Sequence, residues 1–229
     1  VLENLVNGGG VASGGELNLA GLDVETIKPF AFRELQVARL VLADNNLTTL
    51  QARALSGLRC HDSIDLSRNS LSTVTPGAFT NVEAAVLDLS RNSLAVLACE
   101  ALAGLSVPSA SALVYTGNPV TTVLKRAFAN ITFRDVNASD TEGCVGVLDL
   151  GGLGIQSLAS YSFVEVQACV VNASFNRMVS LPPSVFGGMR AAVNLEGNTA
   201  LRTLESHAFS ESLIPPTEVV RLSGLGITD

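Results

Sequence analysis

Apolar and polar residues alternate over short segments that recur along the chain. The segment 64–71 reads Ile-Asp-Leu-Ser-Arg-Asn-Ser-Leu, and the segment 87–94 has the same order with only the first residue changed. Apolar residues at the first, third and eighth places predict a short strand followed by a turn, because successive strand side chains point to opposite faces. The chain therefore carries an internal repeat made of one strand and one return segment.

The sixth place of this pattern is polar although its surroundings are apolar. Asn occupies it at positions 45, 69, 92, 118, 176 and 198, and Leu occupies it at 22, 153 and 225. An inward Asn is tolerable when its amide hydrogen-bonds to backbone groups that the turn leaves unpaired, and stacked copies then form a ladder. We expect this ladder to be broken at both ends and once in the middle.

The spacing of the strands predicts a stack of nine repeats. They start near Leu17, Leu40, Ile64, Leu87, Leu113, Leu148, Val171, Val193 and Val220, and five of the eight steps are 22 to 24 residues long. We number these repeats 1 to 9. A Phe falls late in most of them, at positions 32, 79, 128, 163, 186 and 209, which predicts a buried spine of rings packed edge to face.

The pattern L-x-L-x-x-N-x-L, followed by a small residue and Phe, resembles the leucine-rich repeat of the extracellular type, as in Toll-like receptor, Slit and variable lymphocyte receptor ectodomains. The resemblance implies an α/β solenoid, a horseshoe with a parallel β-sheet on its concave face. It implies irregular turns or short helices on the convex face.

The resemblance covers nearly all of residues 1–229, so we expect a single domain. The longest step holds a polar segment, 132–147, without the repeat register, which predicts a loop insertion. Repeats stack only with neighbours and need capped ends. The chain begins without a cysteine-rich cap and stops within a repeat, so we expect the natural protein to be longer.

Charge and hydropathy narrow the choice of partner. The net charge is −7 and the basic residues are scattered, which disfavours nucleic acid and anionic membranes. No stretch reaches the uninterrupted apolar length of a membrane span, so we expect no direct membrane insertion by these residues. A protein ligand with a basic segment fits an acidic chain.

The residues that usually carry catalysis are sparse. His61 and His207 lie six repeats apart, and no phosphate-binding, metalloprotease or hydrolase motif occurs, so we expect no enzyme activity, metal or cofactor. None of the four cysteines forms a C-x-x-C pair. Cys144 and Cys169 occupy nearly matching places on adjacent repeats and are a candidate disulfide; free thiols are the alternative.

Candidate binding residues lie between the two strand apolars, on the outer side of the predicted sheet. They are Asp65, Asp88, Asp149, Asn172 and Asn194. The acidic members form either a patch for a basic ligand or a common strand sequence that serves solubility. The sequons N-x-[ST] make four asparagines candidate glycosylation sites, namely Asn46, Asn130, Asn137 and Asn172.

The family resemblance implies a non-enzymatic recognition module that binds a protein through its concave face. Its extracellular variety implies the ectodomain of a secreted or membrane-anchored receptor or adhesion protein. Two alternatives stay open: an intracellular, cytoplasmic scaffold, and the recognition domain of a receptor kinase whose enzyme part lies outside this chain.

Overall fold

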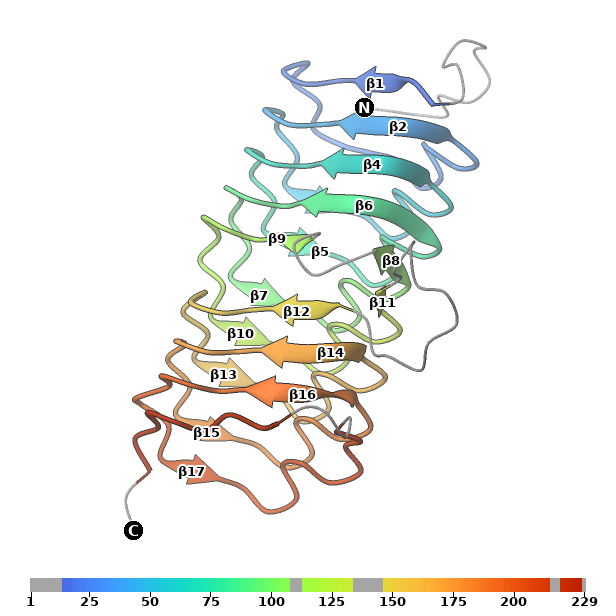
Figure 1. Ribbon diagram of the computed structural model, residues 1–229. Helices are drawn as coiled ribbons and strands as arrows, with labels where there is room; N and C mark the ends of the chain where they lie inside the picture. Colours follow the sequence, from blue (N-terminus) through green and yellow to red (C-terminus); the bar gives the residue numbers. More distant parts are fainter. Residues whose placement is uncertain (1–13, 108–112, 134–145, 215–218, 228–229) are drawn as a thin grey trace.

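The chain winds into a stack of coils, as a computed structural model shows (Figure 1). The structure describes residues 14–107, 113–133, 146–214 and 219–227. Each coil places a strand on one side of the stack, which we call the front, and returns along the opposite side, the back. Every strand pair among these residues is parallel.

In the described parts of the chain, ten strands form the front sheet. They are β1 (Glu16–Asn18), β2 (Gln36–Val41), β4 (Arg59–Asp65), β6 (Val82–Asp88), β8 (Leu105–Val107), β9 (Leu113–Val114), β11 (Thr132–Phe133), β12 (Val147–Asp149), β14 (Gln167–Asn172) and β16 (Arg190–Asn194). Their register aligns the first strand apolars: Leu17 pairs with Leu40, Leu40 with Ile64, Ile64 with Leu87, and Leu87 with Leu113; Leu148 pairs with Val171 and Val171 with Val193. Successive side chains of a strand point to opposite faces of the sheet, so these apolar side chains point into the core and their neighbours in sequence point outward.

The back of the coils carries seven two-residue strands among the residues that the structure describes. They are β3 (Thr49–Leu50), β5 (Thr73–Val74), β7 (Val96–Leu97), β10 (Thr122–Val123), β13 (Ser157–Leu158), β15 (Ser180–Leu181) and β17 (Thr203–Leu204), and they form three small parallel sheets. In the first six, the second residue is apolar and buried. Each of these six strands directs one side chain outward and the next into the core, which closes the back of the coil. A helix would instead need a longer apolar stripe along one face.

No helix occurs in the part of the chain that the structure describes. We predicted an α/β class with irregular turns or short helices on the convex face. Short helices are not observed there, the α/β class is not confirmed, and the architecture is a parallel β-solenoid. Within the same residues, no helix is long and apolar enough to cross a membrane.

Buried asparagines hold the turn that follows each front strand. Asn92 donates from Nδ2 to the carbonyls of Leu66 (3.0 Å), Leu89 (3.0 Å) and Ser90 (3.2 Å), and its Oδ1 accepts from the Leu71 N–H (2.9 Å). Asn45, Asn69, Asn118, Asn176 and Asn198 donate in the same way to their own turn and to the preceding repeat. The side-chain amides thus supply hydrogen-bond partners for backbone groups of the turns, which the strand pairing of the front and back sheets leaves unpaired.

The residue before each ladder position adopts a left-handed backbone conformation. It is Gly at 21, 117, 152, 197 and 224, and Asp44, Arg68, Arg91 or Phe175 in the other repeats, with φ between 51° and 77°. Glycine adopts this conformation freely, whereas a side chain there costs on the order of 1 kcal/mol. The turn therefore requires the left-handed conformation even in the repeats where the residue is not glycine and the conformation is unfavourable for it.

The phenylalanines form part of the core, but their packing differs from our prediction. The rings of Phe128 and Phe163 stack with centroids 5.7 Å apart and planes 2° apart. Phe163 stacks on Phe186, and Phe186 on Phe209, with interplanar angles of 17° and 23°. For these four rings the prediction of edge-to-face packing is wrong, because equivalent positions in stacked repeats place the rings one above another and nearly parallel.

The front sheet is interrupted between repeats 5 and 6. β9 pairs with β6 and β12 pairs with β14, but the described residues include no pairing between β9 and β12, which also lie visibly apart in Figure 1. The earlier halves of these repeats remain joined, since β11 pairs with both β8 and β14. The sheet is therefore continuous along one half of its width and open along the other.

The predicted loop 132–147 begins and ends in this sheet. Thr132 pairs with Ser106 and with Gln167, and Val147 pairs with Val170, so both ends of the segment keep the repeat register. The sequence Ile-Thr-Phe before the insertion continues the alternation of a front strand. The remainder, 134–145, lies outside the described residues.

We predict that the Asn92→Ala substitution lowers the free energy of unfolding by about 3 kcal/mol, because it leaves several buried backbone groups without partners. The control is Asn46→Ala, whose exposed amide makes only one long hydrogen bond, 3.5 Å to Asp23. Urea denaturation followed by circular dichroism measures both. Equal losses in the two variants would contradict a stabilising role for the ladder.

Candidate functional site

The candidate binding residues lie in one row along the front sheet, which we call the front row. On the side of repeats 1 to 5, pairing joins Asn18 to Val41, Val41 to Asp65, Asp65 to Asp88, and Asp88 to Val114. On the other side it joins Asp149 to Asn172, Asn172 to Asn194, and Asn194 to Arg221. Asp65 and Asp88 are therefore neighbours, whereas the interruption and Val114 separate them from Asp149.

Each Asp or Asn of the front row also holds the turn that follows its strand. Oδ1 of Asp65 accepts from the Ser67 N–H at 2.9 Å, and Oδ1 of Asp88 accepts from the Ser90 N–H at 2.7 Å. Asn18, Asp149, Asn172 and Asn194 accept the same bond from the residue two places on. This Asx turn explains why Asp and Asn alternate freely in the row, a structural role that our sequence analysis missed.

Arginines border the acidic part of the row. Arg68 forms a two-pronged ion pair with Asp44, with Nε to Oδ1 and Nη2 to Oδ2 both at 2.7 Å. The hydrogen bond from Arg68 holds the pKa of Asp44 below its usual value. The pKa of Arg68 is raised chiefly by the bond to Asp44, with smaller contributions from the charges of Asp65 and Asp88. The surface around Asp65 and Asp88 therefore carries both positive and negative side chains and is not a continuous acidic patch.

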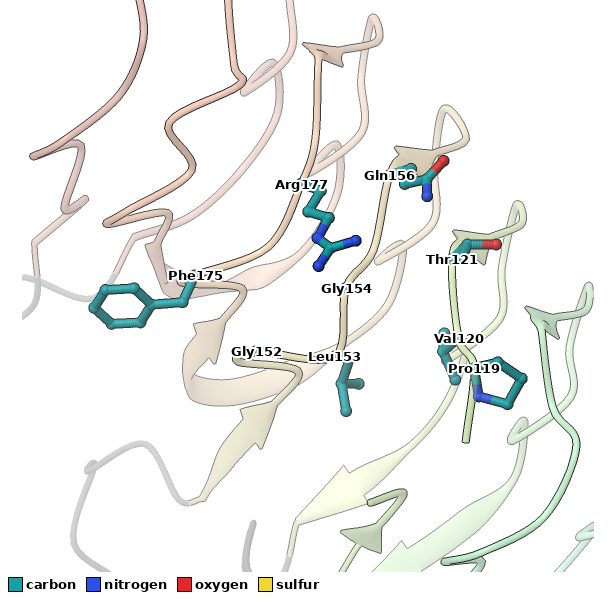
Figure 2. A pocket seen from close by; sticks show the side chains of 9 residues that line it. All are labelled: Pro119, Val120, Thr121, Gly152, Leu153, Gly154, Gln156, Phe175 and Arg177. Carbon is teal, nitrogen blue, oxygen red and sulfur yellow. The ribbon is translucent and has the colours of Figure 1, made fainter. Parts of the chain in front are cut away.

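A crevice of about 360 Å³ lies at the turn end of the interrupted sheet. Pro119 and Val120 of repeat 5 line it together with Leu153 of repeat 6 and Arg177 of repeat 7. Figure 2 shows the Arg177 side chain extending toward Gly154. Leu153 stands where the ladder has Asn in neighbouring repeats, so it offers no amide oxygen to the Val120 N–H and no donor to repeat 5.

Exposure increases on the repeat 5 side of this opening. Asn118 is half-buried, whereas the other ladder asparagines are at most 9% exposed. Thr116 is exposed, whereas Ser67, Ser90 and Ser174 at the same place are buried. The pattern predicted a break in the ladder at Leu153, but only the structure shows that the strand pairing stops there as well.

A family model described as leucine rich repeat matches residues 35–94, which contain β2, β4 and β6. The ladder hydrogen bonds of Asn45, Asn69 and Asn92 in this segment recur outside it at Asn118, Asn176 and Asn198. This segment of the chain is therefore similar to the leucine-rich repeat family. Such domains commonly mediate protein–protein interaction and are typically non-enzymatic. A comparison with curated proteins finds no match.

Two of the four candidate glycosylation sites are exposed. Asn46 lies after the ladder residue, and Asn130 borders a crevice of about 540 Å³ that Arg59 and Ser106 also line. Asn172 is half-buried, and its Nδ2, the atom to which a glycan would be attached, donates to Oδ1 of Asp149 at 2.8 Å. Asn137 lies outside the described residues.

The cysteines fall into two groups. Cys169 is disulfide-bonded, whereas Cys60 and Cys99 are free; Cys144, the partner that we predicted, lies outside the described residues. Burial raises the pKa of the Cys60 thiol to about 11, so little reactive thiolate forms there near neutral pH. Among the described residues, no group of three His, Cys, Asp or Glu side chains could hold a metal ion.

The Asx turn predicts different effects for two substitutions at one position. Asp88→Ala removes the acceptor of the Ser90 N–H and is expected to lower the free energy of unfolding by about 1 kcal/mol. Asp88→Asn retains the acceptor, as Asn172 and Asn194 do, and is expected to change stability by less than about half of that. Thermal and urea denaturation measure both variants, and a loss of the same size in both would contradict the turn as the reason for an Asp at this position.

Proposed function

We propose that this protein recognises another protein through its front sheet, as the ectodomain of a secreted or membrane-anchored receptor or adhesion protein. The observation that carries the proposal is the front row. Parallel pairing sets neighbouring side chains about 4.8 Å apart, and an Asx turn holds six members of the row. A partner therefore meets a preorganised surface, which lowers the entropy lost on binding.

Asp65 and Asp88 supply the most concentrated charge in this row. Each uses Oδ1 to hold its own turn, and the two residues are paired on adjacent strands. Two carboxylates one strand apart favour a ligand with Lys or Arg at matching intervals. We therefore propose a basic segment of the partner as the ligand of this part of the row.

Two other roles use the same surface. An intracellular scaffold would bind its partners through the same rigid row. A receptor kinase would use it for recognition and carry its enzyme part outside these residues. The cellular compartment of the protein distinguishes the intracellular scaffold from the two extracellular roles. Glycans and stable disulfides form in the secretory pathway, so their presence would indicate an extracellular role.

The ligand proposal predicts that a fluorescent dodecapeptide of alternating Lys and Ser binds the protein at low salt. Asp65→Asn with Asp88→Asn is expected to weaken this binding about tenfold, because both charges are lost and both turns are retained. Fluorescence anisotropy measures the affinity. The control, Glu25→Gln with Glu205→Gln, changes the net charge equally at exposed positions outside the row. Absence of binding, or equal weakening in both double variants, would refute the basic ligand.

The extracellular proposal predicts the covalent state of the protein in its native source. Peptide mass mapping without reduction is expected to find glycans on Asn46 and Asn130, and a bridge that joins Cys144 to Cys169. The same map covers Asn137 and Asn172, and a glycan on Asn172 would show that this half-buried side chain is accessible in the native source. Bare asparagines with four free thiols would move the assignment to the intracellular scaffold.

A further inference from the structure

The two strands beside the interruption carry complementary backbone groups that do not meet. In repeats 4 and 5, the Leu89 N–H donates to the Val114 carbonyl and the Arg91 N–H to the Thr116 carbonyl, both at 2.8 Å. The equivalent bonds between repeats 5 and 6 would join Tyr115 to Asp149 and Gly117 to Gly151. Neither bond is formed among the described residues.

This arrangement leaves donors on one side and acceptors on the other. The Tyr115 and Gly117 N–H groups belong to repeat 5, and the Asp149 and Gly151 carbonyls belong to repeat 6. A single extended segment that runs parallel to β9 and β12 has carbonyls for the first pair and N–H groups for the second. Addition of a strand to an open sheet edge is an established mode of peptide recognition, and here two edges face each other.

The side chains at the opening explain why the repeats do not close on one another. Tyr115 occupies the place of Leu42, Leu66 and Leu89 in earlier repeats, and it is buried with its hydroxyl unpartnered. A phenol is longer than a leucine side chain and needs a hydrogen-bond partner when buried. Leu153 at the same junction removes the amide that would tie the two turns together.

We propose that the interruption is a docking site for an extended segment of a partner protein, which adds a strand between β9 and β12 and places an acidic side chain beside Arg177. The segment follows the chain direction of the front strands, so its later residues reach the crevice. Pro119, Val120 and Leu153 there receive an apolar side chain.

The charge of the occupant follows from Arg177. Its side chain is exposed at the crevice and takes part in none of the ion pairs that the described residues form. Among the described residues that line the crevice, it is the only charged one. A carboxylate gives a guanidinium both a charge and a matched pair of acceptors. The proposal rests on protein recognition as the function but does not depend on Asp65 and Asp88.

Hydrogen exchange tests the open edges in the unliganded protein. The Tyr115 and Gly117 amides are expected to exchange at least tenfold faster than the Leu89 and Arg91 amides, which are bonded in the preceding repeat. Equal protection of the two pairs in the free protein would show a closed sheet and would overturn the proposal.

Peptide binding tests the occupant. A positional-scanning library of acetylated and amidated hexapeptides is expected to select an apolar residue followed by Asp or Glu, and the selected peptide is expected to protect the Tyr115 and Gly117 amides. Leu153→Asn restores the ladder residue, and Arg177→Gln removes the cation. Each is expected to weaken binding at least fivefold. Arg190→Gln, a matched change at an exposed arginine of β16, is expected to have no effect.

The backbone contribution has its own test. N-methylation of the alternate peptide amides that face β12 is expected to abolish binding, whereas methylation one residue out of phase is expected to preserve it. Equal effects of both patterns, or a library that selects nothing, would overturn the proposal. Asp65→Asn with Asp88→Asn separates the two sites: loss of hexapeptide binding in that variant alone would assign the peptide to the front row and refute the docking site.

Discussion

Every coil of this molecule must find hydrogen-bond partners for the backbone groups of its turns, and the rest of the structure depends on how it does so. Helices would satisfy those groups internally, but the described residues contain none. The side chains of Asn in the ladder and of Asp or Asn in the front row serve instead, and each sits at a fixed place relative to a strand. These polar residues interrupt an otherwise apolar pattern, and they allow the chain to fold because they satisfy the backbone groups of the turns.

The repetition itself follows from the same requirement. A ladder Asn donates to its own turn and to the turn of the preceding repeat, so one coil alone leaves half of its partners missing. Burial of Leu and Val on both sides of the coil has the same dependence on neighbours. Stability therefore accumulates with stacking, and a defect at one junction affects chiefly the two repeats that meet there.

Much of this architecture could be predicted from residues that repeat. Asn45, Asn69 and Asn92 mark the ladder, and the strand apolars align in the structure at the places where the pattern aligns them. The back was harder, because doublets such as Thr73–Val74 are too short to show a period that separates a strand from a helical turn. The turn-holding role of Asp65 and Asp88 could not be predicted either. An Asp at the end of a strand looks the same in the sequence whether its carboxylate accepts a hydrogen bond from the turn or only faces solvent. The interruption left only indirect signs, Tyr115 for Leu and Leu153 for Asn, and whether two strands pair is decided by packing across repeats.

The stacked phenylalanines limit the interruption to one part of the junction. Phe128 and Phe163 belong to the two repeats whose strands β9 and β12 do not pair, yet their rings stack, and β10 pairs with β13. In the front sheet, β11 still joins β8 to β14. The interruption is therefore a local opening, and it does not divide the solenoid into two separate bodies.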